Sequence, residues 1–338
     1  MLHSNKTKMI LGLVISILFT YLAFRRVNVH QMVDLFLEAN YWYFIAAILV
    51  LFFSHFARAI RWGYLVKPIH EVKIFTLFNA LIIGYMFNVF LPAHLGEFIR
   101  AYVIGQKEPI SSSSAFATIV IERILDVFSL LIIMMFALVI FPFPDWVKTS
   151  GYITFIFILL LFLLLILMKR NRERWQHWML NLSKPLPQHW GRKVDESVRS
   201  FLDGVVPLKN KSHYLIIFFL SILIWAGYVY VFQLIFYGFD FVQIYSLPWY
   251  AALVLLVITT ISILVPSSPG YIGTYHYLCQ LSLGLFAVPA SPALSYALIT
   301  HSVNIFPVLV LGLIILSYEG LNIKTVRAKM DGEGERNI

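Results

Sequence analysis

The chain has 338 residues, of which 60% are hydrophobic and 13% are charged, and its mean hydropathy is +0.80. Soluble domains have about 45–50% apolar and about 25% charged residues, so the composition argues against a water-soluble enzyme and, despite the formal net charge of +9, against a nucleic-acid-binding module. The basic excess fits loops beside an anionic membrane surface. A single cysteine, Cys279, cannot form an internal disulfide, and the sequence contains no Cys/His spacing typical of a metal site.

Apolar runs recur along the whole chain. A helix needs roughly 20 mostly apolar residues to cross the hydrocarbon core of a membrane. Runs of this kind lie near residues 9–24, 41–62, 74–91, 115–141, 151–168, 214–237, 248–265 and 292–317. Two further apolar segments, 92–104 and 266–288, are interrupted by proline and glycine. We therefore predict an all-α, polytopic membrane helix bundle of about eight full spans plus two broken, re-entrant-like segments.

The distribution of basic residues predicts the orientation. Lys and Arg outnumber Asp and Glu by ten to four in the polar segment 169–211, which is expected to carry surface helices near 174–182 and 194–202. The positive-inside rule places this loop in the cytoplasm, together with the N-terminus, and the short tail 318–338 is expected there too. The first apolar run has no small-residue cleavage site after it, so we interpret it as a retained anchor. The whole chain, 1–338, is expected to form one multi-pass domain of the inner cell membrane.

Charged residues inside apolar segments indicate a binding site or internal ion pairs, because a central charge costs about 2.5–3.5 kcal/mol on insertion. Arg58 and Arg61, at the end of the second span, are three residues apart and share one helix face. Arg61 could instead be an interfacial anchor whose long side chain reaches the headgroups. Arg58 lies deeper and is expected to enter the bundle.

The first broken segment contains five residues of interest. They are Asn88, Pro92, Gly96, Glu97 and Arg100. Pro92 interrupts the helix, Gly96 permits close backbone approach, and Glu97 and Arg100 are near enough to pair. Irregular backbone at membrane depth requires burial in protein or a water-filled cavity. A simple surface loop is the alternative interpretation.

The next apolar run contains Glu122, Arg123 and Asp126. Their spacing places all three along one helix edge, where they could form a binding site or a purely structural ion cluster. Two carboxylates and one guanidinium bind anions poorly, so an anion site here would also need Arg58 or Arg100.

A weaker copy of the pattern follows later in the chain. It consists of Pro266, Pro269, Gly270, Gly273 and His276, followed by a span with His301 and Asn304. Proline and glycine are four residues apart in both copies, as in Pro92 and Gly96. The two units, about 74–141 and about 248–317, have opposite predicted orientations, which is typical of inverted-repeat transporters.

Taken together, these motifs resemble those of the lysylphosphatidylglycerol synthase transmembrane region family, the flippase-like domain of the multiple peptide resistance factor and its stand-alone relatives. The resemblance covers roughly residues 41–317. It implies an inner-membrane protein that moves an anionic, aminoacylated or isoprenoid-linked lipid between leaflets. His276 and His301 depart from the family pattern, which often has an acid and an arginine there, so the lipid need not be lysylphosphatidylglycerol.

The leading hypothesis is a lipid translocase with no catalytic residues, metal or cofactor, and without ATP drive, since no Walker motif occurs. Arginines would hold phosphate oxygens, and the acids would pair with them in the empty site or bind a cationic headgroup. The expected substrate-binding residues are Arg58, Arg61, Asn88, Glu97, Arg100, Glu122, Arg123, Asp126, His276 and His301. The expected partners are membrane lipids and no nucleic acid, and self-association into a homo-oligomer is left open.

Two other hypotheses fit the same residues. An intramembrane transferase acting on a polyprenyl phosphate or phospholipid could use carboxylates beside arginines for acid–base chemistry, although no metal-type acidic pair or nucleophile motif supports it. A membrane scaffold could recruit partners through the loop 169–211. In that case the buried charges would be structural.

Overall fold

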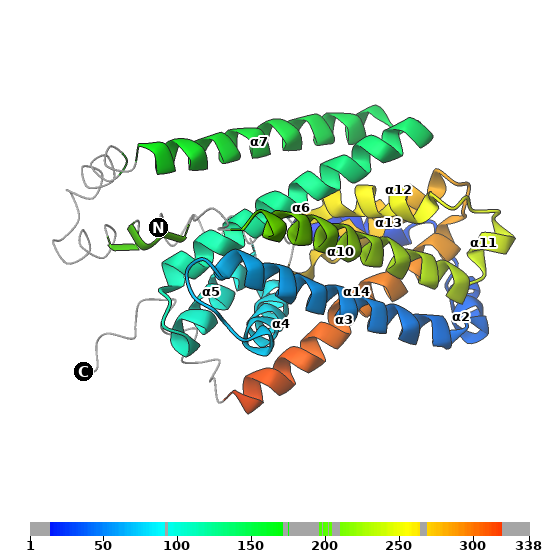
Figure 1. The fold of residues 1–338 in the computed structure, drawn as a ribbon. Coiled ribbons are helices and arrows are strands. Elements are labelled where there is room, and N and C mark those ends of the chain that lie inside the picture. Colours follow the sequence, from blue (N-terminus) through cyan, green and yellow to red (C-terminus); the bar gives the residue numbers. More distant parts are fainter. Residues whose placement is uncertain are drawn as a thin grey trace.

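The computed structural model describes residues 14–91, 94–171, 175, 196–197, 199–201, 203–204, 210–263 and 269–319. All regular structure in these residues is helical (Figure 1). The elements are a first helix Val14–Phe24, α2 (Val29–Glu38), α3 (Tyr41–Val66), α4 (Ile74–Phe90), α5 (Gly96–Lys107), α6 (Ser112–Ile140), α7 (Asp145–Arg170), α10 (Lys211–Gly238), α11 (Phe241–Ile244), α12 (Ala251–Thr260), the 3₁₀ turns Ile261–Ile263 and Pro269–Tyr271, α13 (Thr274–Gly284) and α14 (Ala290–Tyr318). The surface helices expected near 174–182 and 194–202 fall largely outside the described residues.

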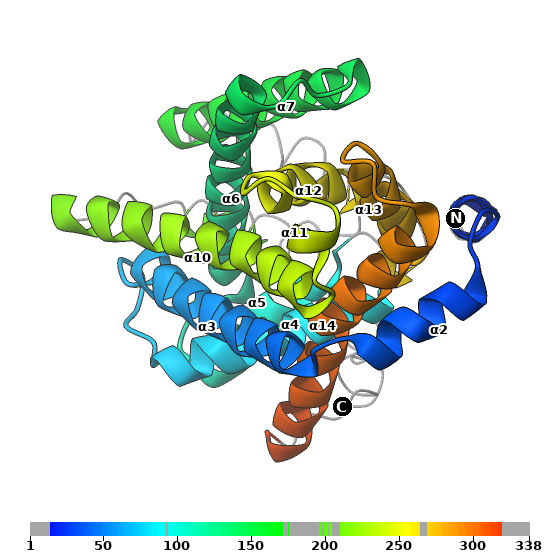
Figure 2. The same ribbon diagram turned by 90° about the vertical axis from the view of Figure 1, so that its right-hand side faces the viewer.

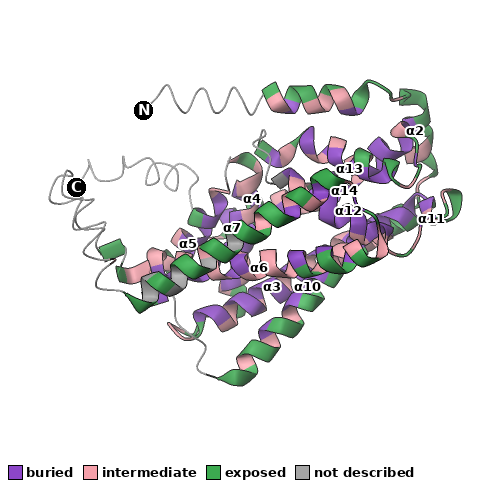
Figure 3. Cartoon of the chain, turned by 90° about the horizontal axis from the view of Figure 1, so that it is seen from above, coloured by how far each residue is buried: buried purple, intermediate pink, exposed green. Residues whose placement is uncertain are grey.

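Four described helices are long and apolar enough to cross a membrane, namely α3, α6, α10 and α14. Large hydrophobic side chains point outward from them, such as Phe53 of α3, Val139 of α6 and Ile314 of α14. Buried positions are concentrated inside the bundle, whereas much of α7 is exposed (Figure 3). Apolar side chains on the outside are expected where lipid replaces water, so the predicted all-α membrane bundle is confirmed.

Two of the predicted spans correspond to short helices in the structure. Helix α4 has 17 residues and α12 has 10, which correspond to about 25 Å and about 15 Å at 1.5 Å per residue. Both are shorter than the hydrocarbon core of about 30 Å. Each instead packs against the segment that follows it, α4 against α5 and α12 against α13. The broken segments are therefore the return arms of two helical hairpins, and the count of about eight full spans stays a prediction.

Close backbone contact holds the first hairpin together. A Cβ atom on Gly96 would lie 2.0 Å from the carbonyl oxygen of Gly84, so only glycine fits at this crossing. Asn88 Oδ1 accepts a hydrogen bond of 2.7 Å from the backbone N–H of Gly96 at the start of α5. This bond satisfies one of the N–H groups that a helix start leaves without an internal partner.

The two hairpins are based at opposite ends of the bundle (Figures 1 and 2). Beside the α4–α5 hairpin, Glu319 at the end of α14 forms an ion pair with Lys107 and accepts a 2.8 Å hydrogen bond from Asn79. At the other end, the ring of Phe141, just after α6, lies 6.2 Å from that of Tyr250 and 5.2 Å from that of Phe286, on either side of α12–α13.

The hairpin tips meet inside the bundle. The Tyr271 hydroxyl lies 3.1 Å from His94 Nε2, and a Cβ atom on Gly270 would lie 3.7 Å from the carbonyl oxygen of Val89. Helix α4 packs against α14 and α12 packs against α6, so each hairpin contacts the long helix that follows the other hairpin. Opposed hairpins with exchanged neighbours are the arrangement expected of an inverted repeat.

Replacing Gly96 should destabilise the protein. We expect Gly96→Ala to lower the free energy of unfolding by about 1–3 kcal/mol, because the added methyl group forces α4 and α5 apart. Thermal or chemical unfolding in detergent micelles measures this loss. Gly284→Ala is the matched control, since no heavy atom lies within 4 Å of the position its Cβ would take. Equal stability of the two variants would contradict the close crossing.

Candidate functional site

The three groups of charged residues predicted from the sequence form one cluster. Helix α3 contributes Arg58 and Arg61, α5 contributes Glu97 and Arg100, and α6 contributes Glu122, Arg123 and Asp126. Every member has an ion-pair partner within this set. We call these seven residues the ionic cluster. The structure thus places all seven predicted ionic site residues together.

Asp126 joins the cluster to α3. Its Oδ1 lies 2.5 Å from Arg61 Nη2, and its Oδ2 pairs with Arg58 Nη1. Arg61 Nη1 also donates a 2.9 Å hydrogen bond to Ser221 Oγ of α10. The side chain of Arg61 is completely buried. The alternative that Arg61 is an interfacial anchor is therefore wrong, because its guanidinium group points into the bundle.

Glu122 joins the cluster to α5. Its Oε2 accepts a 2.6 Å hydrogen bond from Arg100 Nη2, and its Oε1 accepts one of 3.2 Å from Arg58 Nη1. The guanidinium of Arg100 lies 3.6 Å from the ring centroid of Trp62, a cation–π contact. The Trp62 ring is fixed in turn, since its Nε1 donates a 2.9 Å hydrogen bond to Thr118 Oγ1 on α6.

Arg123 marks the exposed edge of the ionic cluster. Its side chain is 38% exposed, while those of the other six members are at most 10% exposed. Its contacts are loose: Nη1 is 3.7 Å from Glu97 Oε1, and Nη2 is 3.5 Å from the Tyr85 hydroxyl. Its contacts with Glu122 at 3.3 Å and Asp126 at 3.6 Å are also long, so Arg123 can turn toward a ligand without breaking the shorter bonds that these two carboxylates make to Arg58, Arg61 and Arg100.

The ionic cluster has an excess of positive charge. Four guanidinium groups face three carboxylates, which leaves a formal charge of +1. Five buried N–H-bearing nitrogens have no hydrogen-bond partner among the described residues: Nε of Arg58, Arg61, Arg100 and Arg123, and Nη1 of Arg100. Buried donors without partners are costly, so this arrangement suits an anion that accepts hydrogen bonds. No group of three His, Cys, Asp or Glu side chains in the described part of the chain could hold a metal ion.

Sequence reasoning missed the aromatic and hydroxyl side chains around the ionic cluster. Tyr228 of α10 lies with its ring centroid 5.6 Å from the Arg58 guanidinium, and His55 packs 5.1 Å from the ring of Tyr85. Ser221 is the hydrogen-bond partner of Arg61. Because 16% of the chain is aromatic, no spacing distinguishes these residues from lipid-facing ones. Only His55, one turn before Arg58 on α3, carries a detectable signal.

Three predicted binding residues lie apart from the ionic cluster. Asn88 closes the first hairpin, as described above. His301 Nδ1 lies 3.0 Å from His276 Nε2, and His301 Nε2 lies 2.8 Å from the carbonyl oxygen of Gly270. Their roles as substrate-binding residues stay predictions.

The hydrogen bonds fix the tautomers of both histidines. The backbone N–H of Gly273 donates to His276 Nδ1, so His276 carries its proton on Nε2 and donates it to His301 Nδ1. His301 then carries its own proton on Nε2 and donates to Gly270. Both rings are therefore neutral and hold the tip of the second hairpin.

The predicted glycines of the second hairpin lie in its turn. Gly270 and Gly273 have φ of 72° and 87°, values that favour glycine, and Pro269 is described as part of the same turn. Pro92 and Pro266 lie outside the described residues.

The fold and the site define a class: a polytopic membrane protein with two opposed helical hairpins and a buried, net-positive ionic cluster beside one of them. The chain belongs to the lysylphosphatidylglycerol synthase TM region family, whose model matches residues 9–312. It is similar to a UPF0104 membrane protein of Methanocaldococcus jannaschii, with 24% identity over 93% of this chain and 96% of the relative. A UPF0104 membrane protein of Methanothermobacter thermautotrophicus is 21% identical over 83% of this chain and 86% of that relative. No solved structure matches the chain.

Removing one carboxylate from the ionic cluster should destabilise the protein far more than removing an exposed carboxylate. We expect Asp126→Asn to lower the free energy of unfolding by about 3–5 kcal/mol, because it removes the nearest carboxylate partner of two buried guanidinium groups. Denaturation in micelles measures the loss. Asp145→Asn is the matched control. Its side chain is 96% exposed and pairs with Lys148, so the expected change is about 0–1 kcal/mol.

Proposed function

We propose that the protein is a lipid translocase that moves a phosphate-bearing lipid between the leaflets of the cell membrane without ATP. The observation that supports this most directly is the ionic cluster, which is buried in a membrane bundle, carries a formal charge of +1 and is open at Arg123. A structural ion cluster needs neither an excess charge nor donors without partners. A site that receives an anion needs both.

The ionic cluster can lower the main barrier to lipid exchange, which is the desolvation of the headgroup. A headgroup cannot cross hydrocarbon unaided, because its phosphate would lose its hydrogen bonds to water. Guanidinium groups can replace those bonds, and arginine suits this role because its planar fork matches phosphate oxygens in pairs. Glu97 and Arg123 are the members best placed to yield to a ligand, because all of their ion pairs have N–O distances of 3.3 to 3.7 Å and none is shorter.

The opposed hairpins give such a site access to both sides. Both are interrupted within the bundle and touch at Tyr271 and His94, so a small displacement at the tips can open one side while closing the other. The lipid moves down its own gradient, or its movement is coupled to protons through the carboxylates or the histidine pair.

Two re-entrant hairpins also give a consistent topology. If α4–α5 and α12–α13 each return to the side they enter from, the crossings are the four long apolar helices α3, α6, α10 and α14, together with the predicted apolar runs 9–24 and 151–168. Six crossings put the N-terminus, the basic loop 169–211 and the C-terminus on one side of the membrane. The positive-inside rule makes that side the cytoplasm.

Loss of the Arg123 or the Glu97 side chain should slow lipid transport without unfolding the protein. We expect Arg123→Ala and Glu97→Ala to slow leaflet exchange of fluorescent anionic phospholipids in proteoliposomes at least tenfold. Arg123→Ala removes the guanidinium that meets the phosphate at the exposed edge of the ionic cluster, and Glu97→Ala removes the carboxylate that pairs with Arg123 and Arg100 in the empty site. Measuring dithionite quenching of labelled lipid against time gives the exchange rate.

The control for this experiment is Arg25→Ala, which removes an exposed arginine outside the cluster. It should exchange lipid at the wild-type rate. Thermal unfolding of all variants establishes that they are folded. Wild-type exchange by folded Arg123→Ala and Glu97→Ala protein would refute the proposal.

A further inference from the structure

Helix α2 is packed against the rest of the molecule along one side. Met32 and Phe36 face the hydrophobic core, and the ring centroid of Phe36 lies 6.2 Å from that of Phe239, just after α10. At the start of the helix, the backbone N–H of Asn28 donates a 2.9 Å hydrogen bond to Ser291 Oγ of α14. These contacts fix the rotation of α2 about its own axis, so its other sides face defined surroundings.

The rest of the surface of α2 consists of two exposed faces of opposite polarity. Val29, Val33 and Leu37 follow one another at intervals of four residues, which places them along one side of the helix, and they are 65%, 48% and 78% exposed. The polar face is formed by His30, Gln31, Asp34 and Glu38. At about 100° per residue, the faces follow around the helix in the order protein, apolar, polar. A surface helix of a water-soluble protein is typically polar on the sides that the protein does not cover, so the exposed apolar face needs another environment.

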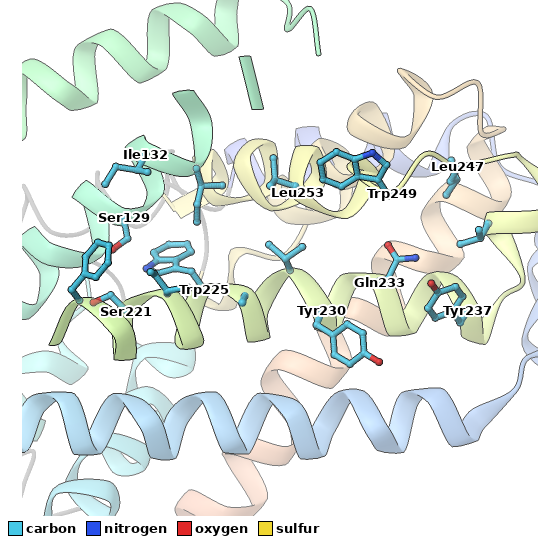
Figure 4. Close-up of a pocket in the computed structure, with 16 residues that line it drawn as sticks. Ser129, Ile132, Ser221, Trp225, Tyr230, Gln233, Tyr237, Leu247, Trp249 and Leu253 are labelled. Carbon is cyan, nitrogen blue, oxygen red and sulfur yellow. The ribbon is translucent and has the colours of Figure 1, made fainter. Parts of the chain in front are cut away.

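The end of the bundle where α2 lies has exposed aromatic side chains. A groove lined mainly by apolar residues of α6, α10 and α12 runs along α10 past Ser221 to Tyr237, with a volume of about 770 Å³ (Figure 4). Trp249 also lines this apolar groove and is 67% exposed, and Trp42 at the start of α3 is 79% exposed. Trp and Tyr are enriched where the hydrocarbon core meets the headgroups. This end of the bundle therefore has the composition of a membrane surface.

Helix α2 lies across this end of the bundle. Figure 2 shows α2 lengthwise, next to the first helix, which is seen nearly end on. In Figure 1, α2 lies at the end opposite to the one where α7 ends and α10 begins. A helix in this position can place its apolar face about 5–10 Å into the boundary between headgroups and acyl chains, while its polar face meets water.

We infer that α2 is an interfacial helix, whose apolar face lies among the acyl chains of the leaflet opposite the basic loop 169–211. The bilayer itself covers this face, because the face continues the lipid-facing surface of α3. The Tyr41 hydroxyl at the start of α3 donates a 2.8 Å hydrogen bond to the carbonyl oxygen of Phe36, and Ile45, one turn further along α3, is 48% exposed. This attachment to the membrane surface is separate from the ionic cluster and does not depend on the proposed function.

The accessibility of spin labels on the two exposed faces tests the inference. Full-length protein in phosphatidylcholine vesicles carries a nitroxide on Val33→Cys or, as the matched control, on Asp34→Cys, its neighbour on the polar face. Anionic lipid is not needed, because α2 contains two acidic residues and no Lys or Arg. Cys279 is buried, and unmutated protein taken through the same labelling gives the background.

The quantity measured is the ratio of collision rates with oxygen, which concentrates in hydrocarbon, to those with a water-soluble nickel chelate. We expect this ratio to be at least about fivefold higher for Val33→Cys than for Asp34→Cys, because only the first label reaches the acyl boundary. Thermal unfolding in micelles establishes that the variants are folded. Leu37→Cys and Glu38→Cys form a second pair of the same kind, should Val33→Cys fail to fold.

Two outcomes would overturn the inference. Equal ratios on the two faces, with both labels reached by the nickel chelate, would place the apolar face in water. A label on the apolar face that neither oxygen nor the chelate reaches would show that a protein surface, such as a second copy of the chain, covers it. Failure of the proposed function appears separately, as wild-type leaflet exchange no faster than in protein-free vesicles.

Discussion

Burial of three arginines inside a membrane bundle, with a fourth at their exposed edge, is the constraint on which the rest of the structure depends. A guanidinium group without a partner in this environment costs several kcal/mol, so each one needs carboxylates from a different helix. Asp126 bridges α6 to α3, and Glu122 bridges α6 to both α3 and α5. The ion pairs therefore fix the position of the first hairpin between two long helices. Without them, α5 would have only its contact with α4 and apolar packing to hold it.

The two halves of the molecule use different chemistry at equivalent places. The first hairpin is held by charged side chains and has an excess of positive charge. The second is held by two neutral histidines, whose protons run in one direction from the Gly273 N–H to the Gly270 carbonyl. The charged residues of the first hairpin are those of the proposed site, whereas the two histidines hold the turn of the second hairpin. The contact between Tyr271 and His94 links the two.

Much of the fold could be predicted because hydropathy is a local property. The long helices α3, α6, α10 and α14 lie within a few residues of the predicted runs, and the ionic residues stood out because charges are rare in apolar segments. The pairing of α4 with α5 could not be predicted in the same way. It depends on Gly84 meeting Gly96, and a glycine in the sequence does not show which backbone approaches it.

The same limit applies to the site. Helical spacing places Arg58 and Arg61 on one face of α3, but it does not say which helix lies opposite. The identity of Asp126 as their shared partner, and the burial of Arg61, follow only from the packing of α3, α6 and α10. The hydroxyl of Ser221 had no signal at all, because serine is tolerated at many positions of a membrane helix.

Ser221 is nevertheless the residue at which the two parts of the site meet. It faces the ionic cluster through Arg61 and the apolar groove through its place on α10. Phosphate and hydrocarbon require opposite surroundings, and a lipid-binding site must offer both within the length of one molecule. Here Ser221 belongs to the uncharged lining of the groove along α10 and also accepts the hydrogen bond from Arg61 of the ionic cluster. A structural ion cluster has no need of such a boundary, so its presence favours an amphipathic ligand over an isolated anion.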